Sequence, residues 1–257
     1  MTIVYGVLYG LFGLVVGSFL NVCIYRIPRR IFWQDSHSFC PHCGSALKWY
    51  DMIPVLSWII LRGRCRTCHE RISPRYPLVE AGNALLWVLS YVTFGLGWYS
   101  AVLCVLFSLL VVGSCIDLDI MELPNGIVIA IAVLGIAPFV ASFFEGSGLP
   151  GNLPWWGYLV GIAAASVPLF LVALVTRGGI GGGDVKLLAA VGFFAGWRLV
   201  LMGTLFGVVL GAIMAIVLMI AFGRTRKAML PLVPALSLGM VVALLWGDAI
   251  LGRLGLI

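Results

Sequence analysis

The sequence has little charge and few groups that titrate near neutral pH. Only 10% of its 257 residues are charged, and it contains 10 acidic residues and three histidines. Soluble globular proteins carry about 25% charged residues, so this composition excludes a water-soluble globule. Disorder and a collagen-like structure are excluded as well, because 62% of the residues are hydrophobic and the 32 glycines show no three-residue period. The mean hydropathy of +1.11 instead indicates a polytopic membrane protein.

Apolar runs of about 20 residues, the length that crosses a bilayer as a helix, recur along the chain. We therefore expect an all-α polytopic membrane protein with about eight transmembrane helices and a small zinc-ribbon-like domain between the first and the second. The first run, Ile3–Tyr25, lacks a basic start and a cleavage site, so it is expected to be retained. The predicted spans lie at about 3–25, 79–97, 98–116, 126–143, 156–176, 185–203, 204–222 and 229–247.

Two boundaries in this pattern are weakly marked, and one apolar stretch is too short to be a span. Only Gly95 and Gly97 separate the second and third runs, and only Gly203 separates the sixth from the seventh. Met52–Leu61 is apolar but about half as long as a span, so it is expected to lie on the membrane surface or to fold into the polar segment around it.

The positive charge is concentrated in the segment 26–77. Its nine basic and three acidic residues give this segment a charge of +6, which is the same as the net charge of the whole chain. Basic residues mark the cytoplasmic side of a membrane protein and contact anionic headgroups, so we expect a lipid partner and no nucleic acid. With this segment inside and eight spans, both termini lie outside, and 14 of the 16 basic residues are cytoplasmic, including those at 177, 186, 224, 226 and 227. Only Arg198 and Arg253 fall outside.

Four of the seven cysteines form two C-x-x-C pairs with 21 residues between them. Paired knuckles at this spacing are a strong signal for one tetrahedral Zn²⁺, and a polar segment this small gains folding free energy from a metal. Four thiolates leave no position for water, which favours a structural ion. His42 and His69 are expected on the knuckle surface, although either could replace a cysteine; a redox or unligated set of thiols is the alternative. The predicted ligands are Cys40, Cys43, Cys65 and Cys68.

Two groups of carboxylates flank predicted spans on the cytoplasmic side. Asp117, Asp119 and Glu122 follow the third span, and a glycine run delivers Asp184 to the start of the sixth. Acidic groups near the bilayer core are functional candidates by default. Two carboxylates from separate helices can share one proton, so that one activates a water and the other protonates a peptide carbonyl. The alternatives are a helix N-cap at Asp184 and solvated loop charges elsewhere; a phosphate loop would need the Lys-Ser/Thr pair that is absent.

Taken together, these motifs resemble those of prepilin peptidases, the type IV leader peptidases of bacterial pilus, competence and type II secretion systems. The resemblance covers nearly the whole chain. The motifs that carry it are Gly17-Ser18-Phe19-Leu20-Asn21-Val22, Arg26-Ile27-Pro28-Arg29, the two C-x-x-C pairs, Tyr50–Ser57, Arg75–Glu80, Asp117 with Leu123-Pro124, and Gly181-Gly182-Gly183-Asp184-Val185-Lys186.

The resemblance implies an aspartic dyad of Asp117 and Asp184, within a G-x-G-D motif that includes Gly181 and Gly183. It implies supporting roles for Asp119 and Lys186, and Glu80 is the best candidate for holding a substrate amine or a basic side chain. The family cuts a basic leader from prepilins or pseudopilins on the cytoplasmic side, after a glycine. It then methylates the new N-terminus with S-adenosylmethionine. No glycine motif of soluble methyltransferases is visible, so the donor pocket is not assigned.

The resemblance also implies a division of the chain and a location. Residues 1–25 are expected to form the first transmembrane helix, 26–77 a cytoplasmic zinc-binding domain associated with methyl transfer, and 78–257 the transmembrane aspartic peptidase domain. The protein is expected in the bacterial inner membrane, with its termini periplasmic or extracellular and its active site facing the cytoplasm. A proton-coupled transporter using the same carboxylates and a non-catalytic scaffold are the alternatives. The sequence indicates no oligomeric state.

Overall fold

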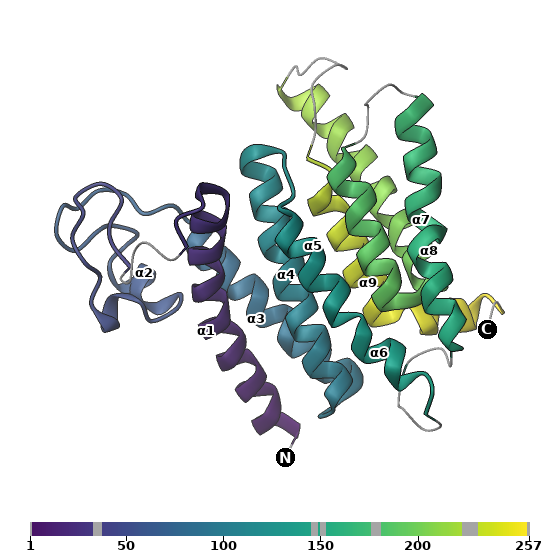
Figure 1. The fold of residues 1–257 in the computed structure, drawn as a ribbon. Coiled ribbons are helices and arrows are strands. Elements are labelled where there is room, and N and C mark those ends of the chain that lie inside the picture. The colour runs from purple at the N-terminus through teal and green to yellow at the C-terminus, as the bar shows by residue number, and fades with distance from the viewer. Residues whose placement is uncertain are drawn as a thin grey trace. The chain divides into compact units, whose positions relative to one another are not determined.

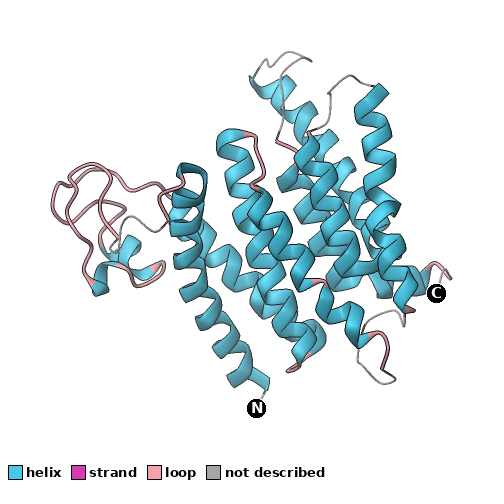
Figure 2. Ribbon diagram, in the orientation of Figure 1, coloured by secondary structure: helices cyan, strands magenta, loops and turns pink. Residues whose placement is uncertain are grey.

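The computed structural model describes residues 2–32, 38–144, 149, 153–175, 181–222 and 231–255. Over these residues all extended regular elements are helices (Figures 1 and 2), and β-structure is limited to two isolated bridges. The predicted all-α class is therefore confirmed. The chain divides into two compact units, Met1–Val112 and Gly113–Ile257.

The first unit contains two long helices that pack against each other, α1 and α3 (Figure 1). Their backbones approach closely at Gly13 and Gly17, because a Cβ at either glycine would lie 2.7 Å from a Cα of α3. The buried amide of Asn83 spans the same contact by donating to the carbonyl oxygen of Gly13 over 2.8 Å. The elements of this unit are α1 (Thr2–Arg29), η1 (Trp49–Asp51), α2 (Leu56–Ile60), α3 (Arg75–Phe94) and most of α4 (Trp98–Ile120).

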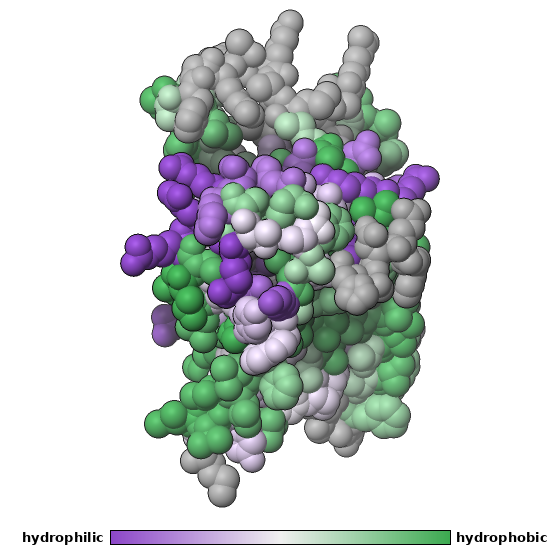
Figure 3. All heavy atoms as spheres, turned by 90° about the vertical axis from the view of Figure 1, so that its left-hand side faces the viewer, coloured by the Kyte–Doolittle hydropathy of each residue, from purple (hydrophilic) through white to green (hydrophobic). Residues whose placement is uncertain are grey.

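The polar segment between α1 and α3 differs from the helices in its surface. Hydrophilic side chains gather on the face that carries it, whereas the part of α1 on that face is hydrophobic (Figure 3). The predicted Met52–Leu61 stretch forms the short helix α2 inside this segment and leaves Leu56, Ile59 and Ile60 between 56% and 72% exposed. Which of its two expected placements it takes, on the membrane surface or folded into the polar segment, stays a prediction.

The second unit contains the end of α4, α5 (Asn125–Leu134), α6 (Ile136–Ala141), α7 (Trp155–Val175), α8 (Gly182–Phe222) and α9 (Val233–Arg253). The span over 126–143 stays a prediction: α5 and α6 together form one short apolar helix, Asn125–Ala141, and Gly135 between them has helical backbone angles (φ −64°, ψ −17°). Pro138 has no N–H to donate to the carbonyl oxygen of Leu134, which weakens the helix at this point.

Helix α8 is a helical hairpin. It covers 41 residues, which as a straight helix would measure about 60 Å, twice the hydrocarbon thickness of a bilayer. Gly196 interrupts it with a φ of 77°. Before the kink, Gly192 contacts Gly161 of α7; after it, Leu199 lies beside Gly247 near the end of α9, and Gly211 lies beside Leu232 at its start. The break predicted near Gly203 is therefore at Gly196.

Five helices in the described ranges are long and apolar enough to cross a membrane: α1, α4, α7, α8 and α9. This indicates a multi-pass membrane protein, while the number of eight spans stays a prediction. The predicted boundary between the second and third spans is confirmed, because α3 ends at Phe94, Gly95 has a φ of 71° and α4 begins at Trp98. The cytoplasmic cations predicted at 177, 224, 226 and 227 lie outside the described residues.

Candidate active site and metal site

The two predicted catalytic carboxylates are both buried within the second unit. Asp117 lies in the last turn of α4 and Asp184 in the first turn of α8. Both are buried, with 6% and 7% of their surface exposed, and they are close enough to interact electrostatically. The fold thus brings two acidic groups that are far apart in the sequence into one low-dielectric site.

Backbone groups at the starts of α9 and α8 complete this carboxylate site. The N–H of Val233 donates to Oδ2 of Asp117 over 3.1 Å. The first N–H groups of any helix have no partner within it, so α9 satisfies one of its own by orienting the carboxylate. At the start of α8, the N–H of Asp184 donates to the carbonyl oxygen of Gly181 over 3.1 Å. Three helix ends therefore fix the positions of the two acids.

The glycines before Asp184 provide space. A Cβ at Gly183 would lie 3.1 Å from Cβ of Leu123, and one at Gly181 would lie 3.1 Å from Oδ2 of Asp184, whereas Gly182 faces open space. Gly183 thus allows a close approach to Leu123, and Gly181 leaves room for the Asp184 carboxylate. None of the residues 181–183 has a positive φ, because α8 already begins at Gly182.

Polar side chains border this site on its exposed side. Nζ of Lys186 donates to Oδ1 of Asn125, at the start of α5, over 3.1 Å. Asp119 lies two residues after Asp117, near the end of α4, and is exposed. Glu122, in the connection to α5, is exposed as well. Lys186 thus ties the start of α8 to the start of α5, and two exposed acids follow Asp117 in the chain.

The four predicted metal ligands come together in the first unit. All four sulfurs lie within 4.8 Å of one another, and Sγ of Cys40 and Sγ of Cys68 are 3.9 Å apart. Tetrahedral Zn²⁺ with Zn–S bonds of about 2.3 Å places its sulfurs about 3.8 Å apart, whereas a disulfide would need about 2.05 Å. The cluster fits a closed metal site, and the histidines at 42 and 69 are not part of it.

The two knuckles have the same backbone geometry. In the first, the N–H of Cys40 donates to Ser45 over 3.0 Å and the N–H of Gly44 donates back to Cys40 over 2.9 Å. In the second, Cys65 and His69 repeat these bonds at 2.9 and 3.0 Å, with Glu70 as the acceptor from Cys65. Backbone N–H groups of Cys68 and then Thr67 lower the pKa of the Cys65 thiol to about 6. This favours the thiolate that binds a metal.

Glu80 lies in the first unit, so it belongs to a different unit from the two aspartates. It is 8% exposed, and its Oε2 accepts the N–H of Val55 over 2.7 Å. Ser18 and Asn21 of α1 also hydrogen-bond to this carboxylate. Val55 has a φ of 62°, a conformation that is strained for a β-branched residue and that recurs at functional sites. The motifs around Ser18, Val55 and Glu80 therefore converge on one carboxylate.

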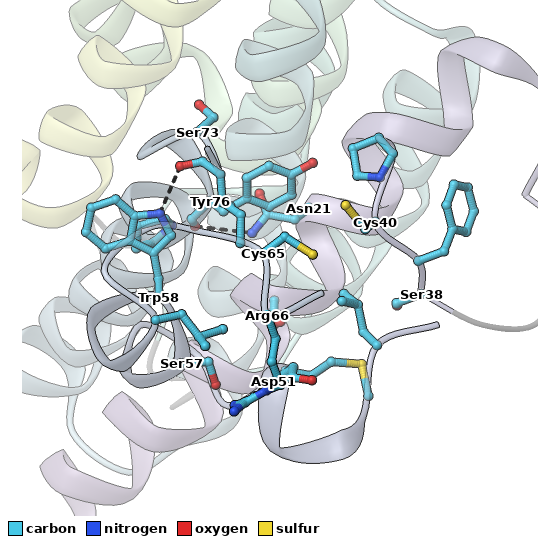
Figure 4. Close-up of a pocket in the computed structure, with 18 of the residues that line it drawn as sticks. Asn21, Ser38, Cys40, Asp51, Ser57, Trp58, Cys65, Arg66, Ser73 and Tyr76 are labelled. Carbon is cyan, nitrogen blue, oxygen red and sulfur yellow. Dashed lines mark hydrogen bonds and ion pairs between the residues drawn. The ribbon is translucent and has the colours of Figure 1, made fainter. Parts of the chain in front are cut away.

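A cavity of about 420 Å³ opens between this carboxylate and the cysteine knuckles (Figure 4). Asn21 and Tyr76 lie together on one side, joined by a hydrogen bond of 3.2 Å from Nδ2 of Asn21 to the Tyr76 carbonyl oxygen. Across the cavity, Arg66 forms an ion pair of 2.9 Å with Asp51. The volume is within the range of small-molecule sites, and Cys40 and Cys65 contribute to its wall.

Two groups in these sites could not be found by searching for reactive side chains. Val233 and Val55 act through their backbone N–H groups, and a valine carries no polar side chain that would draw attention. The signal available for Val233 was the Pro231-Leu232-Val233-Pro234 sequence, because a proline at the start of a helix predicts where its unpaired N–H groups lie. For Val55 we find no comparable signal.

Comparison with known proteins agrees with this arrangement. Residues 11–94 match the bacterial peptidase A24 N-terminal domain, and residues 104–216 match the type IV leader peptidase family. A "Prepilin leader peptidase/N-methyltransferase" of Bacillus subtilis is 33% identical over 94% of both chains. Proteins of the same name from Stutzerimonas stutzeri and Pseudomonas aeruginosa are 36% and 32% identical, over 93% of this chain and 89% and 90% of theirs. No solved structure matches.

These relatives lend no support to the transporter alternative, because they share one enzyme name. Bacterial relatives together with five apolar helices indicate a multi-pass protein of the bacterial inner membrane. The chain belongs to the type IV leader peptidase family and is a peptidase with methyltransferase activity.

Proposed function

We propose that the protein removes the basic leader peptide from type IV prepilins or pseudopilins and then methylates the new N-terminal residue. The proposal rests on one observation above all: Asp117 and Asp184, from two different helices of the second unit, are both buried and interact electrostatically. Close carboxylates in a low-dielectric site tend to hold a single proton between them. That is the state a water-activating peptidase requires.

The cleavage step follows from the two protonation states. The ionised carboxylate takes a proton from a water whose oxygen attacks the carbonyl carbon of the scissile peptide, and the protonated carboxyl donates to the carbonyl oxygen. The tetrahedral intermediate then collapses, the C–N bond breaks, and the leaving nitrogen takes up a proton. The N–H of Val233 holds Asp117 in orientation through these steps. Gly183 lets the start of α8 lie close to Leu123, so that Asp184 can reach the scissile peptide.

The leader is positively charged, so its approach to the dyad needs negative charge. Asp119 and Glu122 supply this on the exposed side of the dyad, and Lys186 holds the adjacent helix ends together. A basic leader stays in the cytoplasm while the apolar helix of a prepilin stays in the bilayer, so the scissile bond lies at the inner interface. This fits an active site that faces the cytoplasm.

The charge distribution supports the same orientation. Arg26 and Arg29 occupy the last turn of α1, directly before the cysteine segment. In the second unit, Arg198 comes just after the kink of α8. The next residue, Leu199, lies beside Gly247 near the end of α9, and Arg253 is the last residue of α9. Both cations are at the opposite end of this unit from the start of α9 and from Asp117. A cytoplasmic site with external termini satisfies the positive-inside rule.

The cysteine cluster and the methyl donor complete the proposal. One structural Zn²⁺ held by Cys40, Cys43, Cys65 and Cys68 would fix the segment 26–77, with no open position for chemistry. S-Adenosylmethionine supplies the methyl group for N-methylation. We assign the methyl-transfer part of the activity to the zinc-binding segment 26–77 and the peptidase part to residues 78–257, which include both aspartates.

A reconstituted reaction in detergent tests the proposal. Purified protein is incubated with a prepilin, with and without S-adenosylmethionine, and the mass of the product N-terminus is measured. Asp117→Asn and Asp184→Asn are each expected to abolish cleavage. Asp248→Asn, a half-buried carboxylate at the far end of α9, serves as the matched control and should cleave normally. Full cleavage by either dyad variant contradicts the proposal.

A further inference from the structure

The cavity beside Glu80 has features that the peptidase chemistry does not use. It lies wholly within the first unit, is about 420 Å³ in volume, and is lined by α1, α3 and the cysteine segment. One of the groups that line it is the buried carboxyl of Glu80. Burying a carboxylate costs free energy unless it is paired, so this arrangement calls for an explanation beyond packing.

The surroundings of Glu80 define the kind of group that would pair with it. In the described chain its hydrogen-bond donors are the N–H of Val55 and the side chains of Ser18 and Asn21, all of which are neutral. A carboxylate offers about four lone-pair sites. Most of its hydrogen-bonding capacity is therefore used, while its charge is not neutralised. The missing partner is a cation that brings charge and needs few hydrogen bonds.

A sulfonium ion has these properties, because its positive charge is spread over sulfur and carbon and it carries no N–H group. The walls suit the rest of a nucleoside sulfonium. Tyr25, Tyr76 and Trp58 provide aromatic surface, and aromatic faces attract cations and stack on planar rings. Arg66, held by Asp51 at 2.9 Å, lies across the cavity and offers donors to a carboxylate.

We propose that this cavity is the S-adenosylmethionine site and that Glu80 is the counter-charge of the donor's sulfonium. The inference rests on the proposed function, since it locates the methyl transfer named there. In that transfer a C–N bond to the substrate amine forms and the methyl C–S bond breaks. The positive charge passes from sulfur to nitrogen, and the methylated ammonium releases a proton to water. The carboxylate of Glu80 lies beside the charge before and after this step.

The cavity also explains how a metal in the cysteine cluster would contribute to donor binding. Cys40 and Cys65, the two buried ligands of the four, line its wall together with residues of both knuckles. A metal that holds the knuckles therefore holds one side of the donor site. Loss of the metal is expected to abolish donor binding. The two aspartates lie in the other unit, so their positions do not depend directly on the metal.

Donor binding is tested first by location. The intact protein in detergent is irradiated with radiolabelled S-adenosylmethionine, digested, and the labelled peptide is identified by mass spectrometry. We expect the label within residues 18–80. A label confined to residues 113–257 would overturn the assignment. The same experiment on Asp184→Asn, which should bind the donor as the unmodified protein does, separates this result from the fate of the dyad.

The role of Glu80 is tested by affinity. Equilibrium dialysis compares S-adenosylmethionine with S-adenosylhomocysteine, which lacks the sulfonium charge. Glu80→Gln should weaken binding of the methyl donor about tenfold or more and leave binding of the demethylated product within about twofold, because only the first carries the charge that Glu80 faces. Equal losses for both ligands would show that Glu80 faces the ammonium group instead, and unchanged affinities would remove Glu80 from the site.

Two further variants protect this test from misfolding. Asp248→Asn removes a half-buried carboxylate of the second unit that does not line the cavity and should change neither affinity more than about twofold. Ile53→Trp adds bulk from a residue that lines the cavity and is 38% exposed, so it should block both ligands without disturbing buried packing. If Ile53→Trp binds both ligands normally, the cavity is not the donor site.

Discussion

The backbone N–H of Val233 and Oδ2 of Asp117 are joined by a buried hydrogen bond of 3.1 Å. It links the first turn of α9 to the last turn of α4, two helices that are more than a hundred residues apart in the chain. Because the unpaired N–H groups at a helix start favour negative charge, the bond both places and orients the carboxylate. The peptidase site is thus built from helix ends, and its precision depends on how closely those helices pack.

The glycine run before Asp184 offers a test of that packing with an internal control. Gly183→Ala should reduce cleavage, because its Cβ would lie 3.1 Å from Cβ of Leu123, whereas Gly182→Ala faces open space and should cleave normally. Leu123→Gly in the Gly183→Ala background should restore part of the activity, because it removes the Cβ atom that the new side chain meets. Cleavage rates of these three variants and of the unmodified protein check this. Equal effects at 182 and 183 would mean that crowding is not the cause.

The crossing of α7 and α8 should be equally sensitive to added volume. A Cβ at Gly161 would overlap the carbonyl oxygen of Gly192, and a Cβ at Gly192 would overlap that of Gly161. Either substitution by alanine is expected to lower the free energy of unfolding by about 1–3 kcal/mol, the usual cost of overpacking. Thermal unfolding in detergent measures this, with Gly82→Ala, which has no neighbour within 4 Å, as the control. A loss at Gly82 as large as that at Gly161 contradicts the packing account.

Metal removal should separate the two activities. Cys40→Ser, or a strong chelator, is expected to release one zinc per chain and to unfold the knuckles, because a domain this small depends on its metal. Methylation of a synthetic peptide with a free N-terminal phenylalanine should then be lost at least as completely as prepilin cleavage. Metal content and both activities are measured on the same sample. Unaltered methylation in the metal-free protein would contradict the assignment of methyl transfer to the segment 26–77.

The helical class, the cysteine cluster and the burial of Asp117 and Asp184 could all be predicted, and the reason is the same in each case. Hydrophobic length, ligand spacing and intramembrane charge leave few alternatives. The break after α3 was predictable too, because Gly95 is followed closely by a second glycine and then by Trp98.

The kink in α8 was not predictable in the same way. This helix contains Gly192, Gly196, Gly203, Gly207 and Gly211, and only Gly196 has a positive φ. The others lie in regular helix, where the absence of a side chain lets α7 or α9 come close, as at Gly203 beside Met240. The sequence alone does not distinguish a glycine that breaks a helix from one that lets a neighbouring helix come close. Only the tertiary contact distinguishes them.

The donor cavity was likewise out of reach of the sequence. It is formed where the knuckles, η1, α2 and the ends of α1 and α3 meet, and no single stretch carries its pattern. Glu80 could be singled out as a buried charge, but its partner Val55 acts through a backbone N–H held at a φ of 62°. Such a contact depends on the folded path of the chain and leaves no trace in residue type.

The most direct test of the central claim is a double-mutant cycle on the dyad. Cleavage of a prepilin is measured for Asp117→Asn, Asp184→Asn and the double variant, with folding checked by thermal unfolding. If the two acids share one proton, each single variant should lose about as much activity as the double variant, because residues that act as a unit are not additive. Independent losses that add up in the double variant, or substantial activity in either single variant, would contradict a shared site.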